Sequence, residues 1–239
     1  MNIKFTVITV CYNASATIRA TIASVLGQTY PELEYIVVDG KSTDGTVEVL
    51  ESIGDARMTF ISEKDTGIYN AMNKGLNMAS GDYLIFLGAD DTFFDQGVLE
   101  RVAAKLTGHS DVVYGDVMLK TRRRLFNGAF TRWTWGHRNL CHQSIFYPKT
   151  IYGRYPYDER YRSVADWDYN LRLLADGTKF TYIAETICTY NDTDGLSSNT
   201  KDRSFLKERR QKVCQAVGIL PYCWGILQRA KRKIMREKW

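Results

Sequence analysis

The stretch 82–91, which reads DYLIFLGADD, constrains the fold of this chain more than any other. Its apolar centre, Tyr83 to Leu87, is typical of a strand that is buried on both faces of a parallel sheet. Ligands of open α/β sheets bind beyond the carboxyl ends of the strands. The two carboxylates that follow, Asp90 and Asp91, therefore predict a site for a metal or a charged ligand. The alternative interpretation is that they only cap the helix expected near Asp95.

The first 90 residues alternate between apolar, β-branched runs and segments with helical periodicity. Four strands separated by three helices predict βαβ units in a mostly parallel, Rossmann-like α/β sheet with helices on both faces. The expected strands cover residues 5–11, 34–39, 58–62 and 83–87, and the expected helices cover about 18–26, 42–53 and 67–79.

This half is typical of a nucleotide-binding fold, although the two common phosphate-binding loops are absent from the sequence. No GxGxxG follows the first strand, and no GxxxxGK[ST] occurs in the chain. Another group must then neutralise the phosphates of a bound nucleotide. A divalent metal held by Asp90 or Asp91 is the expected one.

The second half is less regular. A hairpin is expected around Gly115 and Asp116, between strands 112–114 and 117–120. Further strands are expected at 144–147, 179–183 and 186–190, and helices at 99–106 and 164–175.

The carboxyl-terminal tail differs in charge from the rest of the chain. Residues 201–239 carry twelve Lys and Arg against three acidic residues, a net charge of +9, so residues 1–200 carry a net charge of −4. Helices are expected at 205–217 and, beyond a break at Pro221, at 224–239. The last helix has an apolar side and a basic side, which predicts contact with a membrane surface through residues 218–239. A solvated or partner-binding helix is the alternative, and no nucleic-acid partner is expected.

The cysteines and the amino terminus bear on the compartment. Five scattered cysteines without a CxxC pair argue against a disulfide framework or a structural zinc site, and they favour a reducing compartment. The apolar run at the amino terminus is too short for a signal peptide, and no run approaches the ~18 residues of a membrane-spanning helix. A cytoplasmic location is expected.

Five motifs, taken together, resemble the family 2 glycosyltransferases, inverting enzymes of the GT-A fold that use nucleotide-sugar donors. The most similar subgroup is the bacterial set that assembles cell-surface polysaccharides. The motifs are ITVCYN at Ile8–Asn13, VVDGKSTDGT at Val37–Thr46, EKDTGIYNAMNKG at Glu63–Gly75, SGDYLIFLGADD at Ser80–Asp91 and VADWD at Val164–Asp168.

The resemblance implies a donor site built from the first half of the chain. The loop after the first strand would border the nucleotide base, and Asp39 would bind that base, usually uracil in this family. Asp39 could instead only end its strand and cap the following turn. The implied nucleotide-sugar-binding residues are Thr9, Cys11, Asn13, Asp39, Asp65, Asn70, Lys74 and Asp90.

The resemblance also implies a divalent cation, Mn²⁺ or Mg²⁺. Asp90 matches the last carboxylate of the family's DxD motif, which holds the cation against the diphosphate. Gly88 stands where the first aspartate of that motif is expected. The implied metal ligands are therefore Asp90 and, in an assisting role, Asp91.

The acceptor side is implied by the second half. Asp166 falls where the family places its catalytic base, with capping of its helix as the alternative interpretation and Asp168 as a second candidate. His142 and Gln143 match a pair found near the acceptor, although a structural histidine is an equal alternative. Trp133 and Trp135 are expected to pack in the core, with stacking on acceptor sugar rings as the alternative. Arg122 to Arg124 are expected on a solvated surface, with contact to an acceptor pyrophosphate as the alternative. The implied acceptor residues are His142, Gln143, Trp167 and Asp168.

These observations predict a hexosyl- or N-acetylhexosaminyltransferase that acts with inversion. It would use a UDP-sugar and a lipid-linked or growing glycan acceptor at the inner face of a bacterial cytoplasmic membrane. Residues 1–200 would form the GT-A domain, with a nucleotide-binding half (1–91) and an acceptor half (92–200), and residues 201–239 a basic helical tail.

Two other functions are compatible with parts of the sequence. A sugar nucleotidyltransferase shares the sheet but requires a glycine-rich, arginine-containing loop after the first strand, where this chain has Tyr12, Asn13 and Ala14. A non-catalytic nucleotide- or glycan-binding homologue is suggested by Gly88, because the metal motif is reduced.

Overall fold

The computed structural model of the chain describes residues 3–106, 111–193 and 202–236. Its first half contains the strands and helices expected from the sequence, in the expected order. They are β1 (Phe5–Cys11), α1 (Ile18–Leu26), β2 (Leu33–Asp39), α2 (Thr46–Glu51), β3 (Met58–Ser62), α3 (Ile68–Met78) and β4 (Tyr83–Phe86).

The second half is built from shorter helices and from strands of mixed direction. They are β5 (Thr92–Phe93), α4 (Val98–Lys105), β6 (Val112–Leu119), β7 (Arg124–Phe126), α5 (Arg132–Trp135), the 3-10 turn η1 (His142–Ser144), β8 (Ile145–Pro148), α6 (Lys149–Tyr152), α7 (Ala165–Ala175), β9 (Phe180–Tyr190), α9 (Arg203–Val217) and α10 (Ile219–Arg236).

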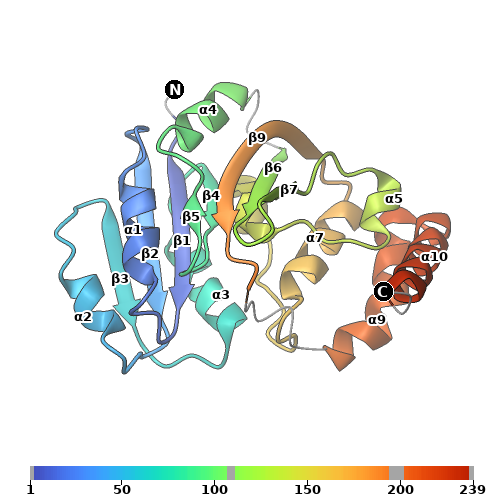
Figure 1. Ribbon diagram of the computed structural model, residues 1–239, viewed down its shortest axis with the longest axis horizontal. Coiled ribbons are helices and arrows are strands. Elements are labelled where there is room, and N and C mark those ends of the chain that lie inside the picture. The colour runs from blue at the N-terminus through green and yellow to red at the C-terminus, as the bar shows by residue number, and fades with distance from the viewer. Residues whose placement is uncertain (1–2, 107–110, 194–201, 237–239) are drawn as a thin grey trace.

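Among the described residues, nine strands form one sheet in the order β3-β2-β1-β4-β8-β6-β9-β5, with β7 paired to β6. The first four are parallel, and β8 joins the halves by running antiparallel to both β4 and β6. Figure 1 shows helices on both faces of this sheet, as predicted. Because β1, β2 and β4 are parallel, their carboxyl ends meet at one edge, where the site is expected.

Two apolar clusters, one on each face of the sheet, form the core. β1 contributes to both, because side chains alternate along a strand: Phe5 and Val7 belong to one cluster and Ile8 to the other. Residues of α1 and α4 complete the first cluster, and residues of α3 and α7 complete the second. The site at the edge of the sheet thus rests on a strand that is packed on both sides.

Residues 112–120 do not form the expected hairpin. β6 is continuous and pairs with parallel β9, which is itself continuous where two strands were expected. A Cβ on Gly115 would lie 2.4 Å from the carbonyl oxygen of Glu185 and 2.8 Å from the Ile187 side chain. Glycine is required here for the close approach of β9, whose pairing with β6 is irregular at this point, and not for a turn.

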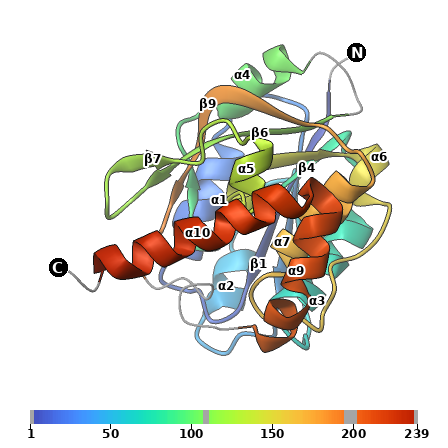
Figure 2. The ribbon, with the colours of Figure 1, turned by 90° about the vertical axis from the view of Figure 1, so that its right-hand side faces the viewer.

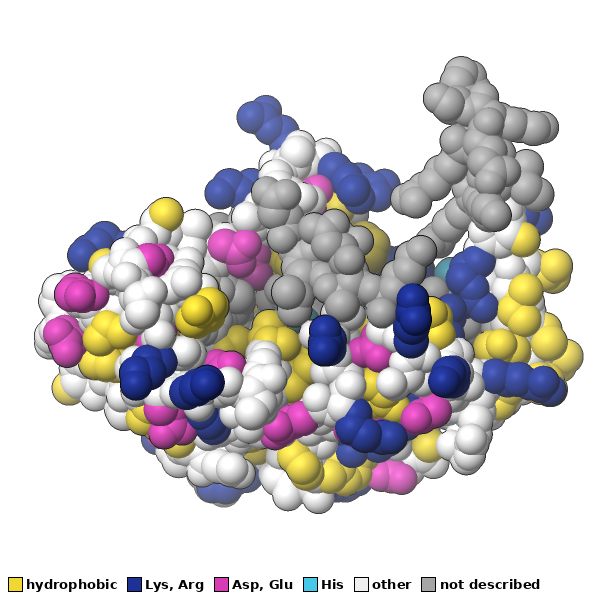
Figure 3. All heavy atoms as spheres, turned by 90° about the horizontal axis from the view of Figure 1, so that it is seen from below, with side chains coloured by type: hydrophobic (Ala, Val, Ile, Leu, Met, Phe, Trp, Pro, Cys, Tyr) yellow, Lys and Arg dark blue, Asp and Glu magenta, His cyan; other side chains and the backbone are white. Residues whose placement is uncertain are grey.

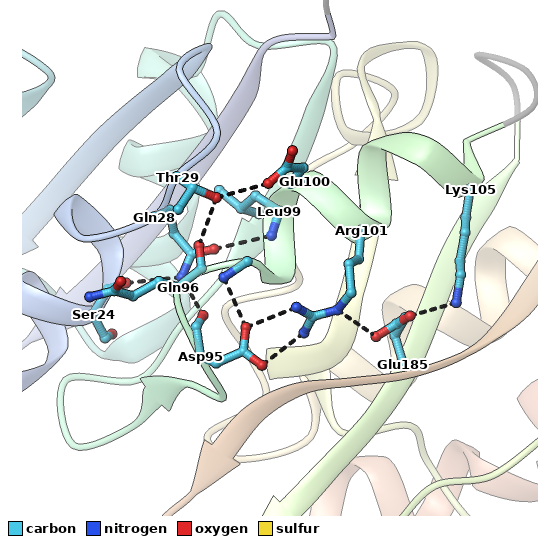
Figure 4. Close-up of polar contacts among 11 residues, drawn as sticks. Ser24, Gln28, Thr29, Asp95, Gln96, Leu99, Glu100, Arg101, Lys105 and Glu185 are labelled. Atoms are coloured by element: carbon cyan, nitrogen blue, oxygen red, sulfur yellow. Dashed lines mark hydrogen bonds and ion pairs between the residues drawn. The ribbon is translucent and has the colours of Figure 1, made fainter.

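A polar network fixes α4 across β9 (Figure 4). The Arg101 guanidinium donates two hydrogen bonds of 3.0 Å to Asp95 and one of 3.0 Å to Glu185. Lys105 donates to the same glutamate at 2.6 Å. In Figure 1 α4 lies near the amino end of β1, so this network supports the scaffold at the end of the sheet remote from the expected site.

The carboxyl-terminal helices pack against the second half. α9 buries Phe205, Val213 and Val217, and it contacts α7. Pro221 does not break the last helix: it lies in the first turn of α10, where its missing N–H costs no helical bond. The break is at Gly218, whose φ of +91° is left-handed. The predicted boundary at residue 200 and the last three residues of the tail lie outside the described residues.

α10 crosses the side of the molecule over α5 (Figure 2) and presents apolar side chains to solvent. Leu220, Trp224 and Leu227 are 68%, 41% and 56% exposed. Trp133 of α5 packs against Trp224 at 6.2 Å between ring centroids and is also exposed, whereas Trp135 is in the core. Figure 3 shows hydrophobic side chains gathered along the right-hand edge, over these helices, beside Lys and Arg side chains.

Within residues 3–106, 111–193 and 202–236, no helix combines the length and the apolar character needed to cross a membrane.

Candidate active site

A cavity of about 880 Å³ lies at the carboxyl ends of β1 and β4, between the two halves of the chain. Cys11 and Asn13 line it from the end of β1, and Asp90 lines it just after β4. His142 and Asp166 line it from the second half. The fold therefore brings predicted donor-side and acceptor-side residues, which are far apart in the sequence, to one cavity.

The two carboxylates after β4 have different environments. Asp90 is exposed in the cavity, and its Oδ2 accepts a hydrogen bond from Asn191 Nδ2 at 2.9 Å. Asp91 is 1% exposed, and its two oxygens accept from the Asn191 N–H (2.7 Å) and Gln143 Nε2 (3.0 Å). Burial raises the pKa of Asp91 to about 6.

Neither carboxylate caps the following helix, because the N-cap of α4 is Gly97. The assisting metal role predicted for Asp91 does not match its position either: both oxygens are used inside the protein. Asp91 instead holds Gln143 and the end of β9 beside the cavity. Of the two carboxylates, Asp90 is the one that is exposed in the cavity.

Asp166 lies in the first turn of α7 and is 9% exposed. The Tyr69 hydroxyl donates to its Oδ1 at 3.1 Å, and Asn139 Nδ2 donates to its Oδ2 at 2.6 Å. His142 Nδ1 lies 3.7 Å from the same Oδ2. The N-cap of α7 is Val164, so the capping interpretation of Asp166 is wrong. Two neutral donors fix this carboxylate, while each oxygen keeps a lone pair for a further donor.

Trp167 and Asp168 are neighbours in sequence but have different surroundings. Trp167 lines the cavity, and its ring packs on Phe205 at 5.2 Å and under the Arg209 guanidinium at 4.8 Å. Asp168 is 1% exposed and forms ion pairs with Arg172 (2.9 Å) and Lys212 of α9 (2.6 Å). The predicted acceptor contact of Asp168 is therefore corrected to an anchor between α7 and α9.

His142 and Gln143 both line the cavity from η1. The Gln143 amide is fixed on two sides, because it donates to Asp91 and its Oε1 accepts from the Cys141 thiol at 2.9 Å. His142 approaches Asp166 and is partly exposed. The pair thus links the carboxylate after β4 to the carboxylate of α7.

Two residues predicted to contact the nucleotide base are buried instead. Thr9 is fully buried, and its Oγ1 accepts a hydrogen bond from the Tyr35 hydroxyl at 3.1 Å. Asp39 is also fully buried and accepts from the Ser42 N–H at 2.9 Å and from the Ser62 hydroxyl at 2.7 Å. Burial raises the pKa of Asp39, but these hydrogen bonds outweigh it and lower the pKa. Asp39 organises the loop after β2, as its turn-capping alternative predicted.

The predicted diphosphate-side residues are engaged within the protein. Asp65 accepts from the Gly67 N–H at 3.0 Å, and Lys74 pairs with Glu63 at 2.9 Å. Asn70 donates to the Glu159 carboxylate at 3.1 and 3.2 Å, which ties α3 to the loop before α7. Asp65 and Lys74 thus support the β3–α3 segment, and Asn70 joins α3 to the second half. None of the three is among the residues that line the cavity with Asp90, and their contact with the diphosphate stays a prediction.

The side chains around Asp90 determine how a divalent cation could be held at this edge. Within the described residues, no three His, Cys, Asp or Glu side chains are grouped to hold a metal ion by themselves. Mg²⁺ commonly binds through one or two carboxylates together with substrate phosphates. Asp90 fits that arrangement, because it is an exposed carboxylate at the edge where a diphosphate would lie.

Several residues of the cavity escaped prediction. Tyr69 and Asn139 reach Asp166 from distant segments, and no local sequence pattern marks them. Asn191 and Asp192 follow β9 directly and line the cavity. Polar residues at the end of a strand are a recognisable signal, so these two could have been found by the rule that identified Asp90.

Comparison with known proteins finds related glycosyltransferases. The family model described as Glycosyl transferase family 2 matches residues 6–167. A PGL/p-HBAD biosynthesis glycosyltransferase of Mycobacterium tuberculosis is 38% identical over 213 residues, covering 85% of this chain and 82% of the relative. An uncharacterized glycosyltransferase of the same species is 29% identical over 214 residues, covering 86% of this chain and 81% of that protein.

Solved structures show the same fold. The crystal structure of S. aureus TarS 1-349 in complex with UDP-GlcNAc matches with a TM-score of 0.73 at 19% identity, covering 89% of this chain and 66% of that one. The mannosyltransferase PcManGT from Pyrobaculum calidifontis, in complex with GDP-Man and Mn²⁺, matches with a TM-score of 0.66 at 18% identity, covering 90% of this chain and 63% of that one. At these identities the likeness establishes a shared fold.

Proposed function

Since the chain belongs to glycosyl transferase family 2 and is therefore a glycosyltransferase, we propose that it transfers a sugar, with inversion, from a nucleotide-sugar donor to a lipid-linked or growing glycan acceptor. Its fold is the GT-A type of its structural neighbours. The transferred group is a hexose or an N-acetylhexosamine.

One observation carries the proposal: Asp90 and Asp166 line the same cavity from opposite halves of the chain. Inverting transfer needs one group beside the leaving diphosphate and a base on the opposite side of the anomeric carbon. Asp90 at the end of β4 would be the first of these groups and Asp166 in the first turn of α7 would be the second.

Asp90 would hold Mn²⁺ or Mg²⁺ together with the donor phosphates. A bound cation of this kind neutralises the charge that develops on the leaving diphosphate. Asn191 holds the Asp90 carboxylate in place by donating a hydrogen bond to its Oδ2. Asp91 is buried and both its oxygens already accept protein N–H groups, so Asp90 is the carboxylate that a cation in the cavity would reach.

Asp166 would accept the proton of the acceptor hydroxyl as that oxygen attacks. General-base assistance is typically worth about 10²–10⁴-fold in rate. Tyr69 and Asn139 hold the carboxylate in one orientation, and His142 lies next to it in the cavity. These three are positioning residues, because they act on the base.

UDP-sugars are the first donors to consider. The TarS structure holds UDP-GlcNAc, while PcManGT holds GDP-Man, so donors with either base occur on this fold. Cys11 and Asn13, which line the cavity at the end of β1, would border the base.

The acceptor would be reached at a membrane surface. The relative of Mycobacterium tuberculosis is named for PGL/p-HBAD biosynthesis. In this chain, apolar residues one helical turn apart are exposed on α10. Lys231 on the same helix is exposed, and Arg229 is half-buried. We call Leu220, Trp224 and Leu227 the apolar row of α10. An apolar row beside basic side chains is typical of a helix that lies in the interface of an anionic bilayer. The bilayer would be the inner face of a bacterial cytoplasmic membrane.

The test is a thermal-shift panel of UDP- and GDP-sugars with and without Mn²⁺. A metal-dependent rise in Tm with one class of donor, lost in Asp90→Asn, is the expected result. The same rise without metal, or in Asp90→Asn, would contradict the role of Asp90. Released nucleotide measured on the same panel distinguishes a transferase from a protein that only binds.

A further inference from the structure

A buried chain of hydrogen bonds ends on the proposed base. The Tyr147 hydroxyl donates to Asn170 Oδ1 at 2.8 Å, and Asn170 Nδ2 donates to Asn139 Oδ1 at 3.1 Å. Asn139 Nδ2 in turn donates to Asp166 Oδ2 at 2.6 Å. Asn139 and Asp166 line the active-site cavity, whereas Tyr147 and Asn170 are not among its lining residues. The chain therefore runs from the interior of the protein to a carboxylate of the cavity.

Three separate segments contribute to this chain of hydrogen bonds. Tyr147 lies on β8, which joins the two halves of the sheet, and it is paired with Leu84 of β4. Asn170 and Asp166 lie four residues apart on α7, so their side chains share one face of the helix. Asn139 lies in the loop between α5 and η1. The chain thus connects a strand of the sheet to the proposed base.

The Asp166 carboxylate fixes the direction of every bond in the chain. An ionised carboxylate accepts hydrogen bonds and has none to donate, so Asn139 must turn its N–H₂ group toward Asp166. The carbonyl oxygen of Asn139 then faces Asn170, which must present its own N–H₂ group in return. The Asn170 oxygen is left for the Tyr147 hydroxyl. Each amide therefore has a single orientation that satisfies its partners.

The inner members of the chain are held in place by burial. Asn170 is 0% exposed and Tyr147 is 1% exposed, and the Tyr147 ring packs against that of Tyr169 at 5.5 Å between centroids. Burial raises the pKa of Tyr147 well above its ordinary value, although a hydrogen bond with Tyr157 acts the other way. The Tyr147 hydroxyl therefore keeps its proton and can donate. A buried amide is costly unless it is hydrogen-bonded, so Asn170 is held to its partners.

Asn139 needs this support because it is only partly buried. Its side chain lies at the cavity, where water can compete for both ends of the amide. Turned end for end, the amide would place its carbonyl oxygen against the Asp166 carboxylate, and the negative charges would repel each other. Asn170 prevents this turn, because its N–H₂ group binds the carbonyl oxygen of Asn139 and not a second N–H₂ group.

We propose that Asn170 is a positioning residue for the transfer reaction, acting through Asn139 on the Asp166 carboxylate. Tyr147 supports Asn170 from β8. This inference rests on the proposed function, because it concerns the base of that reaction. The chain keeps an N–H group on Asp166 Oδ2, while the Tyr69 hydroxyl occupies Oδ1. The lone pair that receives the acceptor proton is thereby held in a constant direction.

The first test removes the N–H₂ group of Asn170 and keeps the size of the side chain. Asn170→Leu leaves Asn139 free to turn. The kcat of nucleotide release should fall about tenfold, the effect of one lost hydrogen bond to a base, while the KM of the sugar donor stays unchanged. Release is measured with Mn²⁺, the donor selected by thermal shift and a bacterial lipid extract as acceptor.

A second variant guards against a simple loss of folding, because Asn170→Leu leaves the buried Tyr147 hydroxyl without its acceptor. Tyr147→Phe/Asn170→Leu replaces both partners by apolar groups and should keep more of the wild-type Tm than Asn170→Leu alone. Its kcat should nevertheless fall by the same factor. A kcat equal to that of wild type in this double variant would overturn the proposal.

A double-mutant cycle separates positioning from general destabilisation. Asn139→Ala alone should lower the kcat at least as much as Asn170→Leu does. Adding Asn170→Leu to Asn139→Ala should have no further effect, because the amide through which Asn170 acts is gone. The proposal is wrong if Asn170→Leu costs the same factor in kcat in both backgrounds.

Tyr152→Phe is the matched control for the tyrosine. The Tyr152 hydroxyl is buried and donates at 2.7 Å to the Gly81 carbonyl, which is not part of the chain. This variant should lower the Tm and leave the kcat at the wild-type value. Tyr147→Phe should lower the kcat, by less than Asn170→Leu does. Equal kcat values for Tyr147→Phe and Tyr152→Phe would overturn the role of Tyr147.

A measurement on the free protein tests the orientation of Asn139 apart from catalysis. In ¹⁵N-labelled protein the side-chain N–H₂ signals of Asn139 are identified by their loss in Asn139→Ala. Their exchange with water should be slow in wild type and faster in Asn170→Leu, and equal exchange in the two would overturn the proposal. If Asn170→Leu speeds the exchange but wild type releases no nucleotide, the orientation of Asn139 is supported and the proposed function is contradicted.

Discussion

Gly88 determines how the two carboxylates after β4 divide their roles. A Cβ at this position would lie 2.5 Å from Asp91 Oδ2 and 3.2 Å from Asp90 Oδ1. The buried orientation of Asp91, which is bonded to Gln143, therefore requires glycine here. The missing first aspartate of the metal motif is thus coupled to the internal use of Asp91.

Restoring that aspartate is expected to harm the protein. In Gly88→Asp the new side chain displaces Asp91, breaks its bond to Gln143 and adds a negative charge beside Asp90. The cost of unpairing a buried polar group, about 1–3 kcal/mol, should appear as a lower Tm. Mn²⁺ titrations in the presence of UDP should show no gain in metal affinity.

Gly54→Asp is the matched control, because a Cβ at Gly54 meets no atom within 4 Å. It should leave the Tm close to that of wild type. A Gly88→Asp variant with wild-type Tm and tighter Mn²⁺ binding would contradict this account of Gly88.

A strand end or a family motif marks single residues in the sequence, and the roles predicted for them stay predictions. Asp90 and Asp166 were both predicted, and the fold brings them to one cavity. Thr9 and Asp39 were placed in the site but are covered by Tyr35, Ser42 and Ser62. Those contacts join neighbouring strands and loops, and a one-dimensional pattern does not contain them.

At the scale of elements, Glu34 at the start of β2 connects β2 to the start of β1 and to the turn before β4. Its carboxylate accepts from the Ser80 N–H (2.9 Å) and hydroxyl (2.6 Å), from Lys4 (3.1 Å) and from Thr6. Burial raises the pKa of Glu34, but these hydrogen bonds outweigh it and lower the pKa to about 2. Folding favours the charged form, so the stabilisation is present above the unfolded pKa of about 4.3 and is lost as the pH falls toward 2.

Glu34→Gln should therefore lower the Tm near neutral pH by a few degrees, with a difference from wild type that shrinks below about pH 4. Thermal unfolding followed by circular dichroism at a series of pH values measures it. The exposed Glu51→Gln on α2 is the control and should show no such trend. A difference in Tm between wild type and Glu34→Gln that stays constant down to about pH 2 would contradict this role of the charged Glu34 carboxylate.

Elements of the first half were predictable because local alternation and helical spacing agree with their parallel pairing. The elements of the second half were less predictable, because β6 and β9 are continuous strands only when they pair with each other. The pairing removes both the hairpin expected at Gly115 and the break expected within β9. Pro221 likewise was interpreted as a break, although Gly218, three residues earlier, ends α9.

For the whole molecule, the exposed apolar row of α10 predicts how the enzyme meets its acceptor. Leu227→Glu should weaken binding to vesicles of phosphatidylglycerol about tenfold, because one leucine side chain is no longer buried in the interface. Co-sedimentation measures this. UDP binding should be unchanged, because Leu227 is not among the residues that line the active-site cavity.

The same substitution at Leu206 of α9 is the matched control, because Leu206 and Leu227 are both 56% exposed. Leu206→Glu should sediment with vesicles as wild type does. Equal vesicle binding by wild type and Leu227→Glu would remove the support for a membrane-facing α10.

The central claim is that Asp166 acts as the base of an inverting sugar transfer in the cavity it shares with Asp90. The most direct measurement is the rate of nucleotide release by wild type and Asp166→Asn, with Mn²⁺, the donor selected by thermal shift and a bacterial lipid extract as acceptor. Asp166→Asn should bind the donor as wild type does and release nucleotide about 10²–10⁴-fold more slowly. A rate within a few-fold of wild type would contradict the claim.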